Sequence, residues 1–156
     1  MEKYCFLEDT PVGRLCIGEA EGCITGVTWE EPPADAVREE TPLLQRCREE
    51  LCSFFRGERQ SFDLPLYCKG TAFQKQVWAA LQEIPYGETR TYGEIAAAIG
   101  RPKAARAVGM ANHQNPIAIL IPCHRVIGAK GKLTGYAGGI EKKEWLLELE
   151  QRHKDF

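Results

Sequence analysis

The spacing of the apolar residues changes near residue 70, and this change limits the folds that the chain can adopt. The first thirty residues alternate apolar and polar side chains around turn signals such as Thr10-Pro11-Val12-Gly13. This pattern predicts short strands at 4–7, 14–18 and 23–29. After residue 70 the apolar residues recur at helical spacing instead. We therefore expect an α+β protein, with strands concentrated in the first half and helices in the second.

One helix and one further strand are expected to complete the first half. Residues 30–40 are acidic and contain two prolines, which predicts a loop. Thr41-Pro42 then supplies an N-cap and a first-turn proline for a helix that ends near Gly57. A last short strand is expected at 62–66. The apolar face of the helix is made by Leu43, Cys47, Leu51 and Phe54 or Phe55.

The second half shows helix starts and stops in close succession. Thr71 can cap a helix that stops at Pro85-Tyr86-Gly87. Thr91 and Glu94 fit a capping box, which opens a short helix that ends at Gly100. A further helix is expected from Pro102 to about His113. Two short helices joined by a glycine-containing turn predict a helix-turn-helix.

Composition narrows the class of protein further. A chain of 156 residues with 44% hydrophobic content can build one good core or two small ones. It has no apolar run that could span a bilayer and no apolar stretch typical of a signal peptide at its start. None of its seven cysteines falls in a CxxC pair with metal-ligand spacing. We therefore expect free thiols, a cytoplasmic protein and no metal site.

The charges are distributed unevenly although the net charge is only −2. Residues 1–70 hold 8 Lys/Arg against 14 Asp/Glu, whereas residues 89–140 hold 7 Lys/Arg against 1 Asp/Glu. Such a basic stretch suits a surface that faces phosphates. Taken alone it is more typical of a solvated face, so it supports nucleic-acid binding only together with other signals.

The hexapeptide at 121–126 carries the chemistry that stands out most. It places Cys123 directly before His124, behind Pro122 and at the end of an apolar run. A thiol becomes a good nucleophile when it loses its proton, and a neighbouring imidazole is the usual base. Side chains that are adjacent on an extended segment point in opposite directions. Either a sharp turn or a bridging water is therefore needed to connect them.

The order and spacing of several motifs point to one family. Six motifs follow one another along the chain: Tyr92-Gly93-Glu94-Ile95-Ala96, 101–109, Asn115-Pro116, the hexapeptide, 135–139, and 143–147 with Glu150. From about residue 73 to residue 150 this arrangement resembles the O6-alkylguanine-DNA alkyltransferases. Residues 1–70 resemble the family's variable N-terminal region only loosely. The resemblance implies an RNase H-like α/β scaffold domain over 1–70 and a mainly helical, winged helix-turn-helix domain over 71–156.

The resemblance also implies roles for the residues around the cysteine. Cys123 would take the alkyl group, His124 would act as its base through a water, and Glu150 would orient the histidine. Asn115 would join backbone segments near the thiol. On the residues alone, Glu150 is one of several acidic residues of a C-terminal helix, and Asn115 before proline predicts a simple Asx turn.

A second set of residues is implied to meet DNA. Arg106 would fill the space left by an extruded nucleotide, and Tyr92 would help to rotate that nucleotide and would hydrogen-bond guanine N3. The small helix that also contains Lys103, Ala105 and Gly109 would lie against the minor groove, although small residues equally favour tight helix packing. The pocket beside the alkyl group would be formed by Tyr136, Ala137, Gly138 and Val126. Ala137 stands where some relatives have a serine, which affects the contact with O6.

The resemblance predicts that the partner is damaged DNA, and other functions can be compared with this prediction. We expect a monomer that acts once, without a cofactor, on duplex DNA containing O6-alkylguanine and, less readily, O4-alkylthymine. A lesion-sensing protein without catalysis is the main alternative, and Cys123 argues against it. A cysteine hydrolase would leave Arg106 and the small helix unexplained, and a transcriptional regulator would leave the thiol unexplained.

Overall fold

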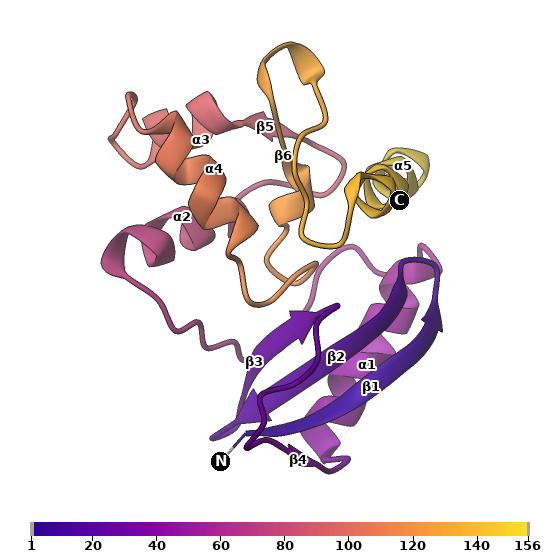
Figure 1. The fold of residues 1–156 in the computed structure, drawn as a ribbon. Coiled ribbons are helices and arrows are strands. Elements are labelled where there is room, and N and C mark those ends of the chain that lie inside the picture. The colour runs from indigo at the N-terminus through magenta and orange to yellow at the C-terminus, as the bar shows by residue number, and fades with distance from the viewer. Residues whose placement is uncertain (1, 156) are drawn as a thin grey trace.

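The structure is a computed structural model, and it describes residues 2–155. It contains a strand-rich part that runs to about residue 70 and a helical part that follows (Figure 1). This arrangement confirms the α+β fold expected from the sequence. No helix among residues 2–155 is both long enough and apolar enough to cross a membrane.

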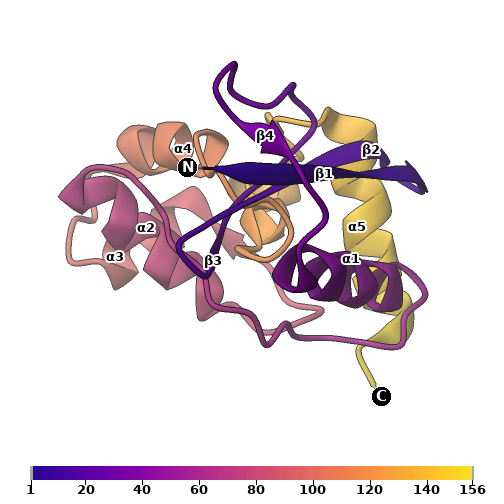
Figure 2. The same cartoon turned by 90° about the horizontal axis from the view of Figure 1, so that it is seen from below.

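The strand-rich part is a four-stranded sheet covered on one face by a helix. Its strands are β1 (Lys3–Thr10), β2 (Gly13–Ala20), β3 (Cys23–Thr28) and β4 (Val37–Arg38), in the order β3-β2-β1-β4. The first three strands are antiparallel, and β4 pairs in parallel with β1. Figure 2 shows α1 (Pro42–Phe55) lying across one face of the sheet. Its buried side chains, among them Leu44, Cys47, Leu51 and Phe54, form the core with the inward residues of the strands.

The helical part begins with three helices that pack on one another. They are α2 (Ala72–Gln82), α3 (Tyr92–Ala98) and α4 (Ala105–His113). The capping box predicted at Thr91 of α3 is present, and Thr71, which was predicted only as a cap, also forms a capping box at the start of α2. A buried hydrogen bond from Trp78 Nε1 to the carbonyl of Ala111, at 2.9 Å, connects α2 with α4. Helices α3 and α4 are the two helices of the predicted helix-turn-helix.

The rest of the helical part carries the cysteine and ends in a long helix. A parallel pair joins β5 (Arg90–Thr91) to β6 (Val126–Ile127), and a 3-10 turn over Cys123–Arg125 precedes β6. A second 3-10 turn, Ala129–Gly131, follows in the loop before α5 (Ile140–His153). Helix α5 packs against the turn that holds the cysteine.

Three sequence predictions of secondary structure were wrong. The loop predicted over 30–40 contains strand β4, which pairs with β1. No strand forms at 62–66, where only Leu66 makes an isolated bridge to Ile24. Pro65 has no N–H to donate, and the N–H of Asp63 is taken by the Glu50 carboxylate. The second helix of the helix-turn-helix begins at Ala105 rather than Pro102, because residues 101–104 form a turn closed by a bond from the Ala104 N–H to the Arg101 carbonyl.

The free edge of β3 connects the two parts of the molecule. Val27 donates its N–H to the Pro116 carbonyl at 3.0 Å, and its own carbonyl accepts from Ala118 at 2.9 Å. Residues 116–118 lie a few positions before Cys123 in the sequence. The sheet therefore holds the segment that leads into the reactive loop.

Candidate active site

Cys123 is placed by a tight reversal of the backbone. Ile119 has a φ of +72°, a left-handed conformation that is unfavourable for a β-branched residue. The reversal is closed by a 3.0 Å bond from the Ile121 N–H to the Ile117 carbonyl. Pro122 then leads into the 3-10 turn that starts at Cys123. A sharp turn, rather than an extended segment, therefore carries the cysteine and the histidine after it.

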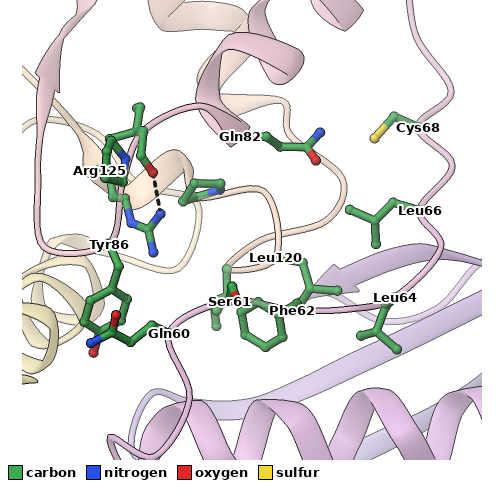
Figure 3. A pocket seen from close by; sticks show the side chains of 14 residues that line it. Gln60, Ser61, Phe62, Leu64, Leu66, Cys68, Gln82, Tyr86, Leu120 and Arg125 are labelled. Atoms are coloured by element: carbon green, nitrogen blue, oxygen red, sulfur yellow. Dashed lines mark hydrogen bonds between the residues drawn. The ribbon is translucent and has the colours of Figure 1, made fainter. Parts of the chain in front are cut away.

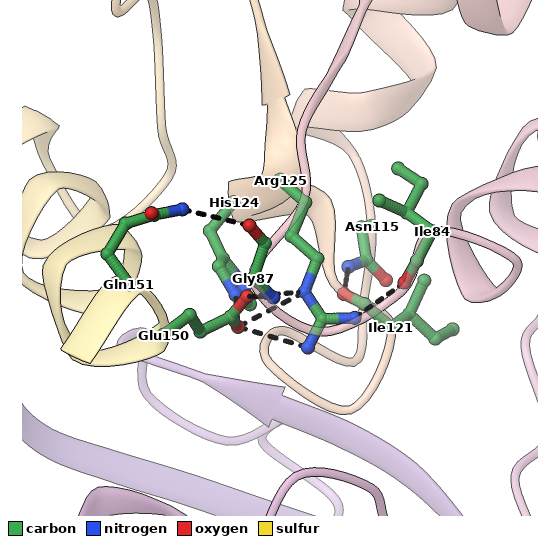
Figure 4. A network of polar contacts seen from close by, with 8 residues as sticks. All are labelled: Ile84, Gly87, Asn115, Ile121, His124, Arg125, Glu150 and Gln151. Atoms are coloured by element: carbon green, nitrogen blue, oxygen red, sulfur yellow. Dashed lines mark hydrogen bonds and ion pairs between the residues drawn. The ribbon is translucent and has the colours of Figure 1, made fainter. Parts of the chain in front are cut away.

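A buried chain of polar contacts extends from His124 (Figure 4). His124 Nε2 lies 2.6 Å from Glu150 Oε2, and both side chains are almost fully buried. Arg125 donates from Nε to the same carboxylate, at 2.8 Å from Oε1, and from Nη1 to the carbonyl of Ile84. The N–H of Gly87 also donates to Glu150 Oε1 at 3.0 Å. Three segments of the chain thus meet at one carboxylate: the 3-10 turn that starts at Cys123, the loop at Gly87 and helix α5.

The protonation states follow from these contacts. Burial alone would raise the pKa of Glu150, but His124 and Arg125 together lower this pKa to about 2. Burial lowers the pKa of His124 from its ordinary value, and Glu150 only partly opposes that effect. Near neutral pH the imidazole is therefore uncharged and donates from Nε2 to the ionised carboxylate. Its Nδ1 is buried and has no hydrogen-bond partner in the described residues, so it remains able to accept a proton.

The thiol is buried among groups that favour its ionised form. Burial raises the pKa of Cys123 above the ordinary value, whereas Asn115, Lys143 and Tyr136 lower it. Cys123 is only 5% exposed. The thiol at rest thus holds its proton, and its surroundings stabilise the thiolate once a base has removed that proton.

Asn115 ties together the backbone on both sides of the reversal. Its Nδ2 donates to the Ile121 carbonyl at 2.9 Å, and its Oδ1 accepts from the Ile117 N–H at 3.0 Å. The second bond is the Asx turn expected from the sequence, and the first is the link between backbone segments. Both interpretations of Asn115 therefore hold at once.

The loop over 134–139 lies beside the thiol. Tyr136 is buried at 7% exposure, whereas Ala137 is exposed and Gly138 is half-buried. Val126 is buried in β6, where it pairs with Arg90. Tyr136 lies close enough to Cys123 to lower the pKa of its thiol, whereas Ala137 lies at the surface.

Helix α4 presents an exposed face beside this loop. Arg106 of α4 and Lys103 of the turn before it are exposed, and Ala105 and Gly109 of α4 are half-buried. Tyr92, at the start of α3, hydrogen-bonds through its hydroxyl to Thr134 Oγ1 at 2.9 Å. A Cβ at Gly109 would lie 3.7 Å from the Tyr92 ring, so the helix passes close to this ring. Tyr92 therefore lies between α4 and the loop over 134–139.

Three residues that sequence reasoning left without a role also belong to the site. Arg125 donates to the same Glu150 carboxylate as His124. Lys143 is fully buried, and its Nζ donates to the Thr134 carbonyl at 3.0 Å. Asn112 is 2% exposed and donates to the Cys123 carbonyl at 3.3 Å. Lys143 and Glu150 lie seven residues apart and so share a helix face with Leu146. Two charged residues on an otherwise apolar helix face were a sequence signal that could have identified Lys143.

A cavity of about 640 Å³ lies behind the polar chain (Figure 3). Its apolar wall comes from the extended segment that follows α1, with Phe62, Leu64 and Leu66, and Arg125 lines its polar end. Cys123 and Tyr136 do not line it. It is therefore distinct from the surroundings of the thiol.

The described residues offer no set of ligands for a metal ion. No group of three or more His, Cys, Asp and Glu side chains is gathered anywhere between residues 2 and 155. All seven cysteines are free.

Comparison with protein families matches nearly the whole chain. Residues 3–68 match the ribonuclease-like domain of 6-O-methylguanine DNA methyltransferase, and residues 72–152 match the DNA-binding domain of the same family. The chain belongs to the 6-O-methylguanine DNA methyltransferase family. The resemblance seen in the sequence is thus confirmed, including the ribonuclease-like character of the first part.

Individual members of the 6-O-methylguanine DNA methyltransferase family are similar along most of their length. A methylated-DNA–protein-cysteine methyltransferase of Methanosarcina acetivorans is 52% identical over 153 residues, covering 94% of this chain and 97% of its own. The constitutive enzyme of the same name from Bacillus subtilis is 48% identical, with 95% of each chain covered. The crystal structure of Mycobacterium tuberculosis OGT in complex with DNA superposes with a TM-score of 0.90 at 47% identity, covering 97% of this chain and 94% of that one.

Proposed function

We propose that this methyltransferase repairs duplex DNA by moving an alkyl group from O6 of guanine to Cys123 in a single turnover. The observation that carries the proposal is the buried thiol next to a neutral histidine, whose other nitrogen is held by an ionised glutamate. O4-alkylthymine is a poorer substrate of the same reaction. A lesion sensor that only binds would have no use for this arrangement.

The reaction balances without a cofactor. Sγ of Cys123 attacks the alkyl carbon, the carbon–sulfur bond forms, and the bond from carbon to O6 breaks, which leaves guanine as an anion. The thiol proton passes through a water to Nδ1 of His124, and Glu150 stabilises the imidazolium. The departing guanine then takes up a proton. Because water does not hydrolyse a thioether, the thiol is not regenerated.

The residues of the pocket hold guanine while this occurs. The carbonyls of Cys123 and Val126 accept hydrogen bonds from the guanine amino group, which adenine lacks. Tyr136, Ala137 and Gly138 form the wall beside the alkyl group, and backbone amides of this loop donate to O6. Asn115 keeps the reactive loop in its tight conformation.

Helix α4 meets the DNA from the minor groove. Ala105 and Gly109 allow a close approach, and Lys103 contacts a phosphate. The target nucleotide is extruded from the stack, at a cost of about a few kcal/mol. Arg106, exposed on α4, fills the vacated space, and Tyr92 donates a hydrogen bond to guanine N3.

The remaining features of the proposal concern the whole chain. Residues 1–70 form a scaffold domain and residues 71–156 form the DNA-binding and transfer domain, a division supported by the two matched ranges. The protein acts as a monomer in the cytoplasm.

The proposal is tested on the DNA by counting repaired lesions. A duplex with one O6-methylguanine in a restriction site, which the methyl group protects from cleavage, is mixed with increasing amounts of protein. We expect one site to be restored for each protein molecule added, with the base still attached to its sugar. Restoration of several sites per protein molecule, or an abasic site in the product, would contradict single-turnover transfer.

The role of Arg106 is tested by comparing two substrates. We expect Arg106→Ala to slow transfer from duplex DNA about 10-fold or more, because the extruded state loses the side chain that stabilises it. Transfer from free O6-benzylguanine, which needs no extrusion, should change less than twofold. Arg56→Ala serves as a control, since Arg56 is exposed at the end of α1 in the strand-rich part. Equal losses on both substrates would refute the extrusion role of Arg106.

A further inference from the structure

Trp29 lies where the sheet meets the loop of the proposed pocket. It follows β3 directly and is half-buried. Its indole Nε1 donates to the carbonyl of Val12 at 2.7 Å, in the turn between β1 and β2. This bond fixes the plane of the ring, because Val12 itself is 1% exposed.

Gly138 lies directly against the face of this indole. A Cβ at Gly138 would lie 2.8 Å from Cε2 of Trp29 and 2.9 Å from both Cδ2 and Cζ2, closer than real Cβ atoms come. Gly138 is not among the glycines with a positive φ. The glycine is therefore required here by the close approach of the ring and not by its backbone conformation.

The same indole also packs against the ring of Tyr136. The two ring centroids are 5.4 Å apart at an interplanar angle of 71°, a favourable edge-to-face geometry. Tyr136 in turn acts on the Cys123 thiol, whose pKa it lowers. Its hydroxyl is buried and has no hydrogen-bond partner in the described residues. A continuous series of contacts thus runs from the β1–β2 turn through Trp29 and Tyr136 to the reactive sulfur.

Lys142 holds the indole from helix α5. Its Nζ lies 5.4 Å from the ring centroid, within the range of a cation–π contact. The ring is therefore contacted by the β1–β2 turn, by the pocket loop and by α5. Trp29 has little freedom to move without shifting the loop.

We propose that Trp29 is a positioning residue, which sets the place of the Tyr136–Gly138 wall relative to the Cys123 thiol. The inference rests on the proposed function, since that wall is the one that faces the alkyl group. It assigns a role in the reaction to the strand-rich part of the chain. Trp29 itself touches neither DNA nor the transferred group.

The test compares two substitutions at this position. Trp29→Leu removes both the indole N–H and the aromatic ring, whereas Trp29→Phe keeps an aromatic ring against Gly138 and Tyr136. We expect Trp29→Leu to slow transfer about 10-fold, equally from methylated duplex and from free O6-benzylguanine, with an unchanged Kd for undamaged duplex. We expect Trp29→Phe to recover most of the rate. Equal loss on both substrates distinguishes this role from that of Arg106.

Fluorescence supplies a readout that a merely structural role would not change. Because the indole contacts Tyr136, methylation of Cys123 should alter the Trp29 emission. Trp145 packs on Phe55 instead, so the change should persist in Trp145→Phe. It should be lost in Trp29→Phe.

Several results would overturn the inference. One is a folded Trp29→Leu protein that transfers at the wild-type rate, and another is a rate that falls only in proportion to the folded fraction measured by circular dichroism. A third is a methylation-dependent emission change that is as large in Trp29→Phe as in the wild type. If the wild-type protein itself transferred no methyl group, the proposed function would fail instead, so the two failures are distinguishable.

Discussion

Cys123→Ala is expected to abolish alkyl transfer and to leave binding to methylated duplex intact. The substitution removes the only atom proposed to form the new bond, and none of the proposed DNA contacts on α4 involves the thiol. The fold should tolerate the change, since the side chain is small and Asn115 keeps the loop closed through backbone bonds. We expect a loss of about 1 kcal/mol in the free energy of unfolding.

Two measurements check this result. Transfer is followed by methyl incorporation, and binding by a gel shift with duplex that carries O6-methylguanine. Cys52→Ala is the matched control, because Cys52 is a half-buried thiol of α1. Stoichiometric methylation of the Cys123→Ala protein would show that another residue is the acceptor.

Glu150→Gln is expected to impair both the reaction and the stability of the fold. The amide still accepts a hydrogen bond but no longer neutralises Arg125, a cation that is 7% exposed. Loss of one partner of a buried ion pair costs about 3–5 kcal/mol. The imidazolium of His124 would also lack its counter-charge, so we expect transfer to slow about 100-fold.

The two effects are separated by measuring transfer at a temperature where the variant is folded. Glu148→Gln is the control, because Glu148 is exposed on the same helix. If the folded Glu150→Gln protein transferred at the wild-type rate, Glu150 would stabilise the fold without supporting the base.

The stability lost in this variant should depend on pH. The pKa of Glu150 falls from 4.5 to about 2 on folding, so its contribution is fully present above pH 4.5 and disappears as the pH falls through 2. Such a shift corresponds to a contribution on the order of 3 kcal/mol. Urea unfolding between pH 7 and pH 3 should therefore show a steeper loss of stability for the wild type than for Glu150→Gln. Parallel curves would contradict this assignment.

The order of secondary structure was accessible from the sequence because its signals are local. Caps such as Thr71 and Thr91 bond to residues three positions away, so their neighbours suffice to reveal them. The strand at 62–66 was predicted wrongly because pairing depends on a partner far along the chain. There the edge of β3 is shared between residues 65–67 and residues 116–118.

The reactive pair was also visible in the sequence, whereas the residues that position and stabilise the pair were not. Cys123 and His124 are neighbours in a rigid context, so their chemistry could be inferred directly. Arg125, Lys143 and Trp29 acquire their importance only when distant segments meet. A lysine on an apolar helix face and a tryptophan after a strand have many ordinary explanations, and only packing around Glu150 and Tyr136 distinguishes among them.

The most direct test of the account is the mass of the intact protein after incubation with duplex DNA that contains O6-methylguanine. We expect every active molecule to gain one methyl group, which persists on removal of the DNA and maps to the peptide that contains Cys123. Tight binding to the methylated duplex with no change in protein mass, or a methyl group on any other residue, would contradict transfer to this thiol.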